Sequence, residues 1–229
     1  MRTIGLLGGM SWESTAIYYR LANELVRERL GGLHSARLLM LSVDFAPIEE
    51  MQVAGRWDEA GQLLAADARR LEAGGADLLV LCTNTMHKVA DVIQEAVSIP
   101  LLHLGDATAG AVREAGLTTV GLLATGFTMS QDFYRARLES HGLTVLVPST
   151  EDQAMVHRVI YDELCLGVVR DESRAAYVDV VDRLVRSGAE GVILGCTEIE
   201  MLIGPDDLDL PSFPTTRIHV EAALDAAVG

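Results

Sequence analysis

Two cysteines stand at the ends of two apolar runs, about half of the chain length apart. Cys82 closes the run LLVLC and precedes Thr-Asn-Thr, whereas Cys196 closes VILGC and precedes Thr-Glu. A thiolate can remove a proton from carbon, and a thiol can return one. Inversion of configuration at one carbon requires two such groups on opposite faces. The pair therefore indicates two-base proton transfer, provided that the fold brings both thiols to one substrate.

A single cysteine at a strand end is more often a small buried apolar residue than a reactive group. Two cysteines in matched positions, each followed by threonine, reverse that expectation. Backbone N–H groups at the start of a helix after Cys-Thr would favour the thiolate and bind an anionic carboxylate. Cys165, in YDELCLG, lies on a helical pattern without a strand before it. We expect Cys165 to be a core residue that the chemistry does not need.

Short apolar runs alternate with amphipathic stretches along the chain. Strands are predicted at 3–7, 36–43, 77–82, 118–123, 143–147 and 191–196, because these runs are continuous and apolar. Helices are predicted at 14–30, 58–74 and 172–188, and Ser11 or Ser14 could cap the first. The alternation predicts an α/β fold, with helices on both faces of a parallel sheet.

The two halves of the chain also resemble each other. IGLLGGMS near the start resembles VGLLATGFTMS, and GGADLLVLCTNT resembles SGAEGVILGCTEI, in the same order and at nearly the same spacing. This favours a duplication, with two similar α/β units related by a pseudo-two-fold axis. Ligands of open α/β sheets bind beyond the carboxyl ends of the strands. We therefore expect the two thiols to approach one cleft between the units from opposite sides.

Two polar or glycine-rich segments also fall at predicted strand ends. Gly8 and Gly9 allow the backbone to approach an anion closely, but the pattern is not GxGxxG, so a dinucleotide site is not favoured. Residues 83–85, Thr-Asn-Thr, could cap the next helix or contact a substrate. Their position at a strand end favours substrate contact.

The composition excludes several classes of partner. A net charge of −15 disfavours binding to nucleic acid or to anionic membranes. Three cysteines are too few for a disulfide scaffold, and no zinc-binding spacing occurs. No apolar run approaches the roughly 20 residues that span a bilayer, and the N-terminus is interpreted as a first strand. A cytoplasmic protein is expected. The sequence identifies no role for the histidines.

The chain resembles the aspartate/glutamate racemase superfamily of cofactor-independent amino-acid racemases over nearly its whole length. The segments that carry the resemblance are GLLGGMSWEST, CTNTMHKV, TMSQDFYRARL, YDELCLG, GCTEIEML and TTRIHVEAAL. Within the superfamily, the chain is similar to the branch of broad-specificity and acidic amino-acid racemases. The resemblance implies two flavodoxin-like domains, expected here at 1–97 with 208–229 and at 98–207. It also implies a cleft between them, a homodimer, and catalysis without metal or pyridoxal phosphate.

The same resemblance implies the site residues. Cys82 and Cys196 match the paired catalytic cysteines. The residues implied to bind the substrate are Gly9, Met10, Gln52, Thr83, Asn84, Thr85, Thr125, Thr128, Thr197 and Glu198.

Two departures from the family pattern bear on specificity and on the shape of the site. Members selective for acidic amino acids commonly carry a lysine where this chain has Cys165, so the cation for a distal carboxylate is missing unless Arg56 or another arginine replaces it. Pro214 stands where an aspartate usually precedes Thr215–Thr216. Broad specificity is therefore expected. The alternatives are an aspartate/glutamate-specific racemase and a non-catalytic amino-acid-binding protein, which would not need both thiols.

Overall fold

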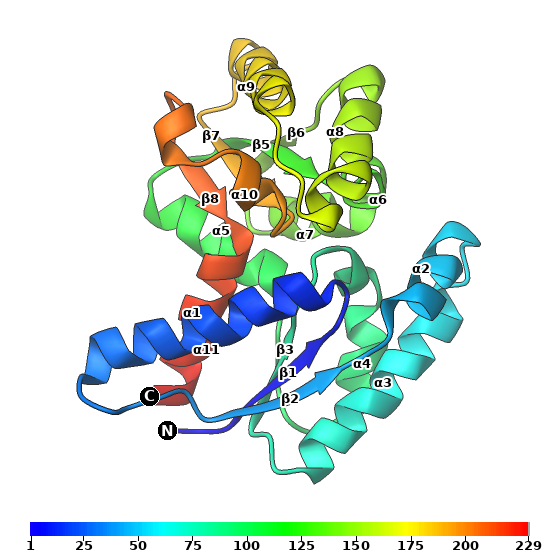
Figure 1. Cartoon of the computed structure of the whole chain (residues 1–229), viewed down its shortest axis with the longest axis vertical. Coiled ribbons are helices and arrows are strands. Elements are labelled where there is room, and N and C mark those ends of the chain that lie inside the picture. The colour runs from blue at the N-terminus through cyan, green and yellow to red at the C-terminus, as the bar shows by residue number, and fades with distance from the viewer. Residues whose placement is uncertain (229) are drawn as a thin grey trace. The chain divides into compact units, whose positions relative to one another are not determined.

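The computed structural model describes residues 1–228, and in it the chain forms two compact α/β units. The first unit comprises Met1–Leu104 and the chain from His219 onward, and the second comprises Gly105–Ile218. The chain therefore passes out of the first unit once and returns to it once. Figure 1 traces the elements of both units. The predicted class, two similar α/β domains built on parallel sheets, is confirmed.

Each unit contains a four-stranded parallel sheet, and the two sheets have the same strand order. The first sheet has the order β2-β1-β3-β4, with β1 (Ile4–Gly8), β2 (Leu38–Ser42), β3 (Leu78–Leu81) and β4 (Leu101–Leu102). The second has the order β6-β5-β7-β8, with β5 (Thr119–Ala124), β6 (Thr144–Leu146), β7 (Gly191–Gly195) and β8 (Ser212–Pro214). Each strand of one sheet has a counterpart in the other, in agreement with the internal resemblance of the sequence.

All six predicted strands are present, and the structure adds two. β4 has two residues and β8 has three, and each lies at the edge of its sheet. Strands this short have no apolar run or alternation that a sequence pattern could reveal.

Six helical segments follow the strands of the first sheet or close its unit. They are α1 (Trp12–Leu30), α2 (Phe45–Val53), α3 (Trp57–Ala73), η1 (Thr85–Val89), α4 (Ala90–Glu95) and α11 (Thr215–Val228). α5 (Leu104–Glu114) follows β4 and, after its first residue, belongs to the second unit. α1 begins after Ser11, whose side chain accepts a hydrogen bond of 3.2 Å from the Ser14 N–H. Of the two predicted caps, Ser11 is therefore the one used.

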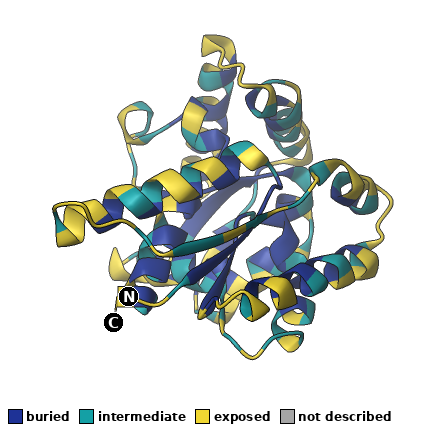
Figure 2. Ribbon diagram, turned by 60° about the horizontal axis from the view of Figure 1, so that its bottom comes forward, coloured by how far each residue is buried: buried dark blue, intermediate teal, exposed yellow. Residues whose placement is uncertain are grey.

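Alternating side chains along the strands divide the first unit into two apolar layers. Residues 4 and 6 of β1, with 78 and 80 of β3, pack against α1 and α11. Residues 7, 79 and 81 pack against α2, α3, η1 and α4. Figure 2 shows the central strands β1 and β3 buried, the edge strand β2 partly exposed, and the outer faces of the helices exposed. Cys82 continues the alternation of Leu78 and Val80, so its side chain enters the layer of α1 and α11.

The second unit is covered in a similar way by helices on its sheet. The helical segments are α6 (Gly126–Ser130), α7 (Asp132–Ser140), α8 (Thr150–Asp162), η2 (Leu164–Leu166), α9 (Asp171–Arg186), α10 (Ile199–Leu202) and η3 (Pro205–Asp207). α8 and α9 both contact β5. They are joined by a buried hydrogen bond of 2.8 Å from the Tyr177 hydroxyl to the Val156 carbonyl.

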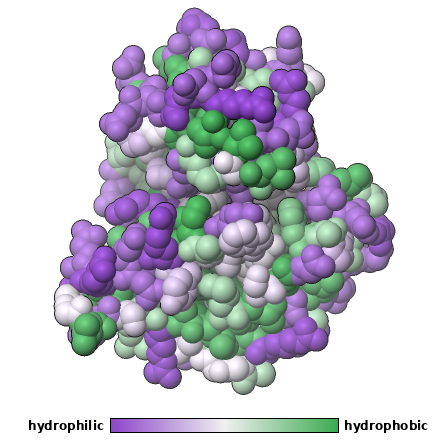
Figure 3. All heavy atoms as spheres, in the orientation of Figure 1, coloured by the Kyte–Doolittle hydropathy of each residue, from purple (hydrophilic) through white to green (hydrophobic). Residues whose placement is uncertain are grey.

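The surface carries many charged residues, as the net charge of −15 requires. The face drawn in Figure 3 is largely hydrophilic, with smaller apolar areas between the polar side chains. Within residues 1–228, every helix is either too short or too polar to cross a lipid bilayer.

Gly9 makes the turn that ends β1. Its φ is +99°, which side chains other than glycine rarely adopt. A Cβ atom at this position would lie 2.3 Å from the Val43 carbonyl oxygen and 2.4 Å from the Val43 nitrogen. The Gly9 N–H donates to Thr15 Oγ1 at 2.8 Å, which ties the turn to α1. The absence of a side chain at Gly9 therefore lets the turn pack closely against the end of β2 and the start of α1.

We predict that Gly9→Ala lowers the free energy of unfolding by about 3 kcal/mol or more, because backbone strain and overpacking each cost roughly 1–3 kcal/mol. Urea denaturation measures the change. The matched control is Gly110→Ala in α5, where a Cβ atom meets nothing within 4 Å. That change should stabilise the protein by about 0.5–1 kcal/mol. Equal denaturation midpoints for the two variants would show that the turn does not need glycine.

Candidate active site

The predicted site residues of each unit gather where the two central strands of its sheet end. In the first unit the Cys82 N–H donates to the Leu7 carbonyl at 2.9 Å, and the Val43 N–H donates to the Gly8 carbonyl at 2.9 Å. The segments that follow β1, β2 and β3 are thereby aligned. In the second unit Ala124 pairs with Gly195, so Thr125 and Cys196 leave the sheet on neighbouring strands.

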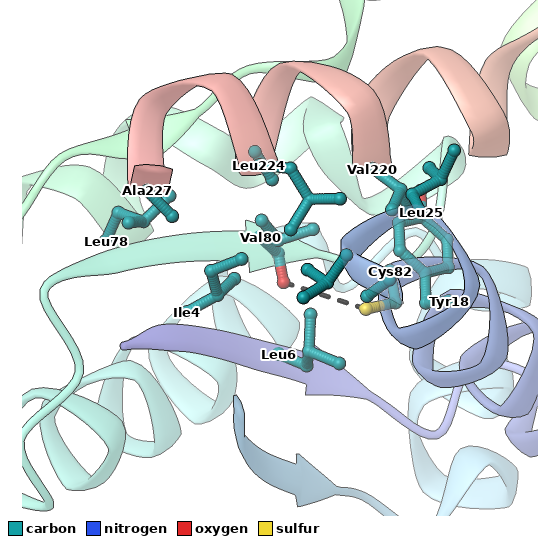
Figure 4. Packing of buried hydrophobic residues seen from close by; sticks show 13 residues of the cluster. Ile4, Leu6, Tyr18, Leu25, Leu78, Val80, Cys82, Val220, Leu224 and Ala227 are labelled. Atoms are coloured by element: carbon teal, nitrogen blue, oxygen red, sulfur yellow. Dashed lines mark hydrogen bonds between the residues drawn. The ribbon is translucent and has the colours of Figure 1, made fainter. Parts of the chain in front are cut away.

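The Cys82 side chain is fully buried, with 0% of its surface exposed. Figure 4 shows the sulfur among apolar side chains of β1, α1 and α11, including Leu6, Leu25 and Val220. The thiol donates to the Val80 carbonyl, with 3.7 Å between sulfur and oxygen. Burial raises the pKa of Cys82 well above that of an ordinary cysteine. At neutral pH this residue therefore holds its proton.

Cys196 has a carboxylate as its partner. The side chain is 8% exposed, and its sulfur lies 2.9 Å from Glu198 Oε2. Burial, and then the negative charge of Glu198, raise the pKa of Cys196 well above its usual range. A second carboxyl group, Glu200, lies two residues further on, and burial raises its pKa to about 7. Glu198 thus contacts the thiol itself.

The late segment after Pro214 joins this group of residues. The Thr216 N–H donates to Glu200 Oε1 at 3.4 Å, and the Thr216 hydroxyl donates to Thr197 Oγ1 at 3.2 Å. Pro214 ends β8, and α11 begins at Thr215. Glu200 and Thr216 were not among the residues predicted from the sequence. The two glutamates of GCTEIE, two residues apart, were the sequence feature that could have pointed to Glu200.

Thr125 and Thr128 form a helix cap in the second unit. Thr125 is the N-cap of α6, and its hydroxyl oxygen accepts from the Thr128 N–H at 3.4 Å. The two hydroxyl oxygens are 3.2 Å apart, and both residues are buried. The pair lies at the end of β5, beside the segment that carries Cys196.

Gln52 is a buried amide whose hydrogen-bonding capacity is only partly used. It is 3% exposed, and its Nε2 lies 3.0 Å from the Met86 sulfur. Among residues 1–228, its Oε1 has no hydrogen-bond donor. Met10 packs in the same apolar cluster as Met86. A buried acceptor without a donor is costly, and a bound ligand that supplies an N–H would remove that cost.

The Thr-Asn-Thr segment forms a tight turn after Cys82. Thr83 is half-buried, whereas Asn84 and Thr85 are buried. The Thr83 carbonyl lies 2.7 Å from His87 Nδ1, and the Asn84 carbonyl accepts from the His87 N–H at 3.0 Å. Thr85 begins η1. The turn is thus held by His87, for which the sequence analysis found no role.

The expectation that Cys165 is a core residue on a helix is wrong. α8 ends at Asp162, and Cys165 lies in the short η2 turn, which Gly167 closes with a φ of +72°. The side chain is therefore only partly buried. It lies close enough to Cys196 to contribute, behind burial and Glu198, to the raised pKa of that thiol. Arg56 is paired with Glu59 at 3.0 Å, and its side chain is 44% exposed.

Comparison with known proteins defines the class to which this fold and this site belong. The sequence profile of the Asp/Glu/Hydantoin racemase family matches residues 7–223. The chain is a member of that family.

Particular relatives agree with the assignment. A protein from Yersinia pestis, named only as a candidate Asp/Glu racemase, is 50% identical over the full length of both chains, with a TM-score of 0.94. PH1733 from Pyrococcus horikoshii OT3, described as an aspartate racemase homologue, is 33% identical over both full chains, with a TM-score of 0.89. The broad specificity amino-acid racemase RacX of Bacillus subtilis is 30% identical over 98 residues, which are 43% of either chain. The predicted resemblance is confirmed, and racemase chemistry is supported in general.

We predict that Glu198→Gln lowers the pKa of Cys196, because the variant removes the carboxylate that opposes ionisation of the thiol. Only the thiolate is alkylated rapidly, so the rise of the alkylation rate with pH should move to lower pH. Iodoacetamide labelling would be measured against pH in a Cys82→Ser, Cys165→Ser background, in which Cys196 is the remaining thiol.

The matched control is Glu200→Gln, which removes a carboxyl group bonded to Thr216. It should leave the labelling profile of Cys196 nearly unchanged. A Glu198→Gln profile that coincides with that of the parent would show that the Glu198 charge does not act on the thiol.

Proposed function

We propose that the protein interconverts L- and D-amino acids without pyridoxal phosphate or metal, and that Cys82 and Cys196 are its two bases. The observation that carries the proposal is their equivalent placement. Each cysteine follows the second central strand of its sheet and precedes a threonine. Membership of a racemase family supports the reaction class.

In one direction of the proposed reaction, Cys196 acts as a thiolate and removes the α-proton. The electron pair of the broken C–H bond is delocalised into the substrate carboxylate, and Cys82 gives its proton to the opposite face of the carbon. The cycle leaves Cys196 protonated and Cys82 ionised, and the reverse reaction starts from that state. Because burial raises the pKa of Cys82, this thiol carries the proton that the acid role requires.

Both thiols are protonated in the resting protein, so one proton must leave before turnover. Glu198 Oε2, 2.9 Å from the Cys196 sulfur, is the group placed to accept it. Once it has taken the proton, Glu198 no longer carries the negative charge that opposes the thiolate, and a bound α-ammonium group would favour the thiolate by adding a positive charge. Glu198 is proposed to assist Cys196 in addition to its predicted contact with the substrate.

The substrate contacts are proposed from the polar groups at the strand ends. Gln52 Oε1, a buried acceptor, suits an α-ammonium group. Hydroxyl and N–H groups of the threonine-rich turns suit an α-carboxylate. The proposed set otherwise keeps Gly9, Met10, Thr83, Asn84, Thr85, Thr125, Thr128 and Thr197. Of these, Gly9 contributes the shape of its turn, because its N–H is occupied by Thr15.

Broad specificity is the proposed substrate range. The thiol of Cys165 supplies no positive charge at the position where acidic-selective relatives carry lysine, and Arg56 is engaged by Glu59. The RacX description as a broad specificity racemase supports this range. The description of PH1733 as an aspartate racemase homologue supports the alternative, strict selectivity for acidic amino acids. A homodimer and a cytoplasmic location stay predictions.

We predict that Cys82→Ala and Cys196→Ala each reduce racemisation by about 10²–10⁴-fold, because each removes the acid or base from one face of the carbon. Chiral chromatography after incubation with a single enantiomer measures the inversion. In deuterium oxide each variant should still exchange the α-proton of one enantiomer without inverting it. Cys165→Ala serves as the control and should racemise at the wild-type rate. Near wild-type turnover in either single variant would exclude the two-base mechanism.

We also predict that Cys165→Lys raises kcat/KM for aspartate, relative to a neutral amino acid, by about ten- to a hundredfold. A charge-assisted hydrogen bond contributes roughly 1.5–3 kcal/mol. The ratio of two substrates on one variant cancels any effect of the lysine on the thiols. Cys165→Met, which has similar length and no charge, should leave the ratio unchanged. A wild-type enzyme that already strongly prefers aspartate or glutamate would contradict broad specificity.

A further inference from the structure

Three histidines of the first unit, the buried His87 and His219 and the half-buried His103, lie together and are called the histidine cluster. The ring centroids of His87 and His103 are 4.7 Å apart, and those of His87 and His219 are 5.7 Å apart. His87 and His219 are almost completely buried. Nothing in the proposed proton transfer uses these rings, so their burial needs another explanation.

The hydrogen bonds of His87 fix the position of its proton. Its Nε2 accepts from the Leu104 backbone N–H at 3.1 Å. A backbone N–H can only donate, so Nε2 carries a lone pair. The proton of the neutral ring is therefore on Nδ1, which donates to the Thr83 carbonyl at 2.7 Å. Both nitrogens are satisfied in this tautomer and in no other protonation state.

His219 has the opposite tautomer for the same kind of reason. Its Nε2 lies 2.9 Å from the Leu102 carbonyl, which can only accept, so Nε2 carries the proton. Its Nδ1 then accepts from the Tyr18 hydroxyl at 3.0 Å. Burial lowers the pKa of His219 to about 4, and burial with the neighbouring His103 and His219 rings lowers the pKa of His87 well below its usual range. Both rings are neutral at neutral pH.

The backbone partners of His87 lie next to Cys82 and at the end of the first unit. Thr83 follows Cys82 directly, so His87 holds the backbone of the segment that carries a proposed base. Leu104 is the last residue before the chain leaves the first unit, and His219 is the first residue on its return. His87 thus joins the thiol turn to the outgoing crossover, and His219 joins the returning crossover to β4 through Leu102.

We propose that His87 is a positioning residue of the racemase, which fixes the Cys82–Thr83 backbone to the crossover at Leu104 through one obligatory tautomer, with His219 holding the returning segment against the same cluster. This inference rests on the proposed function. His87 does not exchange protons with substrate. Its role is to keep the turn in one place, because a misplacement of about 1 Å can cost about a hundredfold in rate.

Two conservative variants separate the two bonds of His87. In His87→Gln the amide oxygen reaches the place of Nε2 and can accept from Leu104, but the donor to Thr83 is lost. In His87→Asn the amide nitrogen reaches the place of Nδ1 and can donate to Thr83, but the acceptor for Leu104 is lost. Both should lower kcat about ten- to a hundredfold and change KM by less than about twofold. The control is His103→Gln, which alters a ring of the same cluster and should keep the wild-type kcat.

A merely structural role would give a different result. Activity per folded molecule would then stay at the wild-type value in both His87 variants, while the denaturation midpoint falls. That outcome would overturn the positioning role. Loss of kcat in His87→Gln alone would also overturn it as stated, since the bond to the crossover would not be needed.

A spectroscopic measurement tests the tautomers without reference to activity. Long-range ¹H–¹⁵N correlation spectra of imidazole-labelled protein at pH 7 should show His87 with its proton on Nδ1 and His219 with its proton on Nε2, both neutral. His87 protonated on Nε2, or charged, would refute the inference. If the spectra show these tautomers but the protein racemises no amino acid, the proposed function is wrong, and so is the positioning role that rests on it. The hydrogen bonds of the histidine cluster would still be confirmed by the spectra.

Discussion

Burial of both faces of each parallel sheet is the constraint on which the rest of the structure depends. The central strands β1, β3 and β7 are buried along their whole length and carry no polar side chain, so the polar residues beside them come after the strands end. The burial of β3 extends one residue beyond the strand. Its alternation carries Cys82 one step beyond the strand, into the apolar layer of α1 and α11. Cys82 therefore belongs to the apolar core, and the polar residues of the candidate site follow it directly in the chain.

Burial also sets the charge states of candidate site residues and of the histidine cluster. Cys82 and Cys196 are held as thiols, His87 and His219 are held as neutral imidazoles, and the pKa of Glu200 is raised toward neutrality. Each shift has desolvation as its largest cause. A zwitterionic amino acid would bring both signs of charge into surroundings that otherwise favour neutral groups. In the proposed function, the substrate would thereby alter the protonation equilibria on which its own reaction depends.

The sequence predicted the parts of this arrangement that residue types encode. Apolar runs located six strands, and the internal resemblance singled out Cys82 and Cys196. Other parts escaped prediction for physical reasons. β4 and β8 are too short to leave a pattern. Cys165 continues a helical sequence pattern, but α8 ends at Asp162 and Cys165 lies in the separate short turn η2.

The histidine cluster escaped because its partners are mostly backbone groups of distant segments. A carbonyl at Thr83 or an N–H at Leu104 is present whatever the side chain, so no residue type signals the bond. Glu198 shows the intermediate case. The family resemblance implied that it contacts the substrate, which stays a prediction, whereas its bond to the Cys196 sulfur depends on how the chain turns after β7.

The division of α11 between the two units has a consequence for biosynthesis. The second unit, Gly105–Ile218, is one continuous stretch of chain, whereas the layer that buries Cys82 is completed by Val220, Ala223, Leu224 and Ala227. On the ribosome, the later-made unit has all of its residues before the earlier one does. Met1–Leu104 therefore keep an open apolar face until α11 has been synthesised, and exposed apolar surface of this kind makes an incomplete chain prone to aggregation.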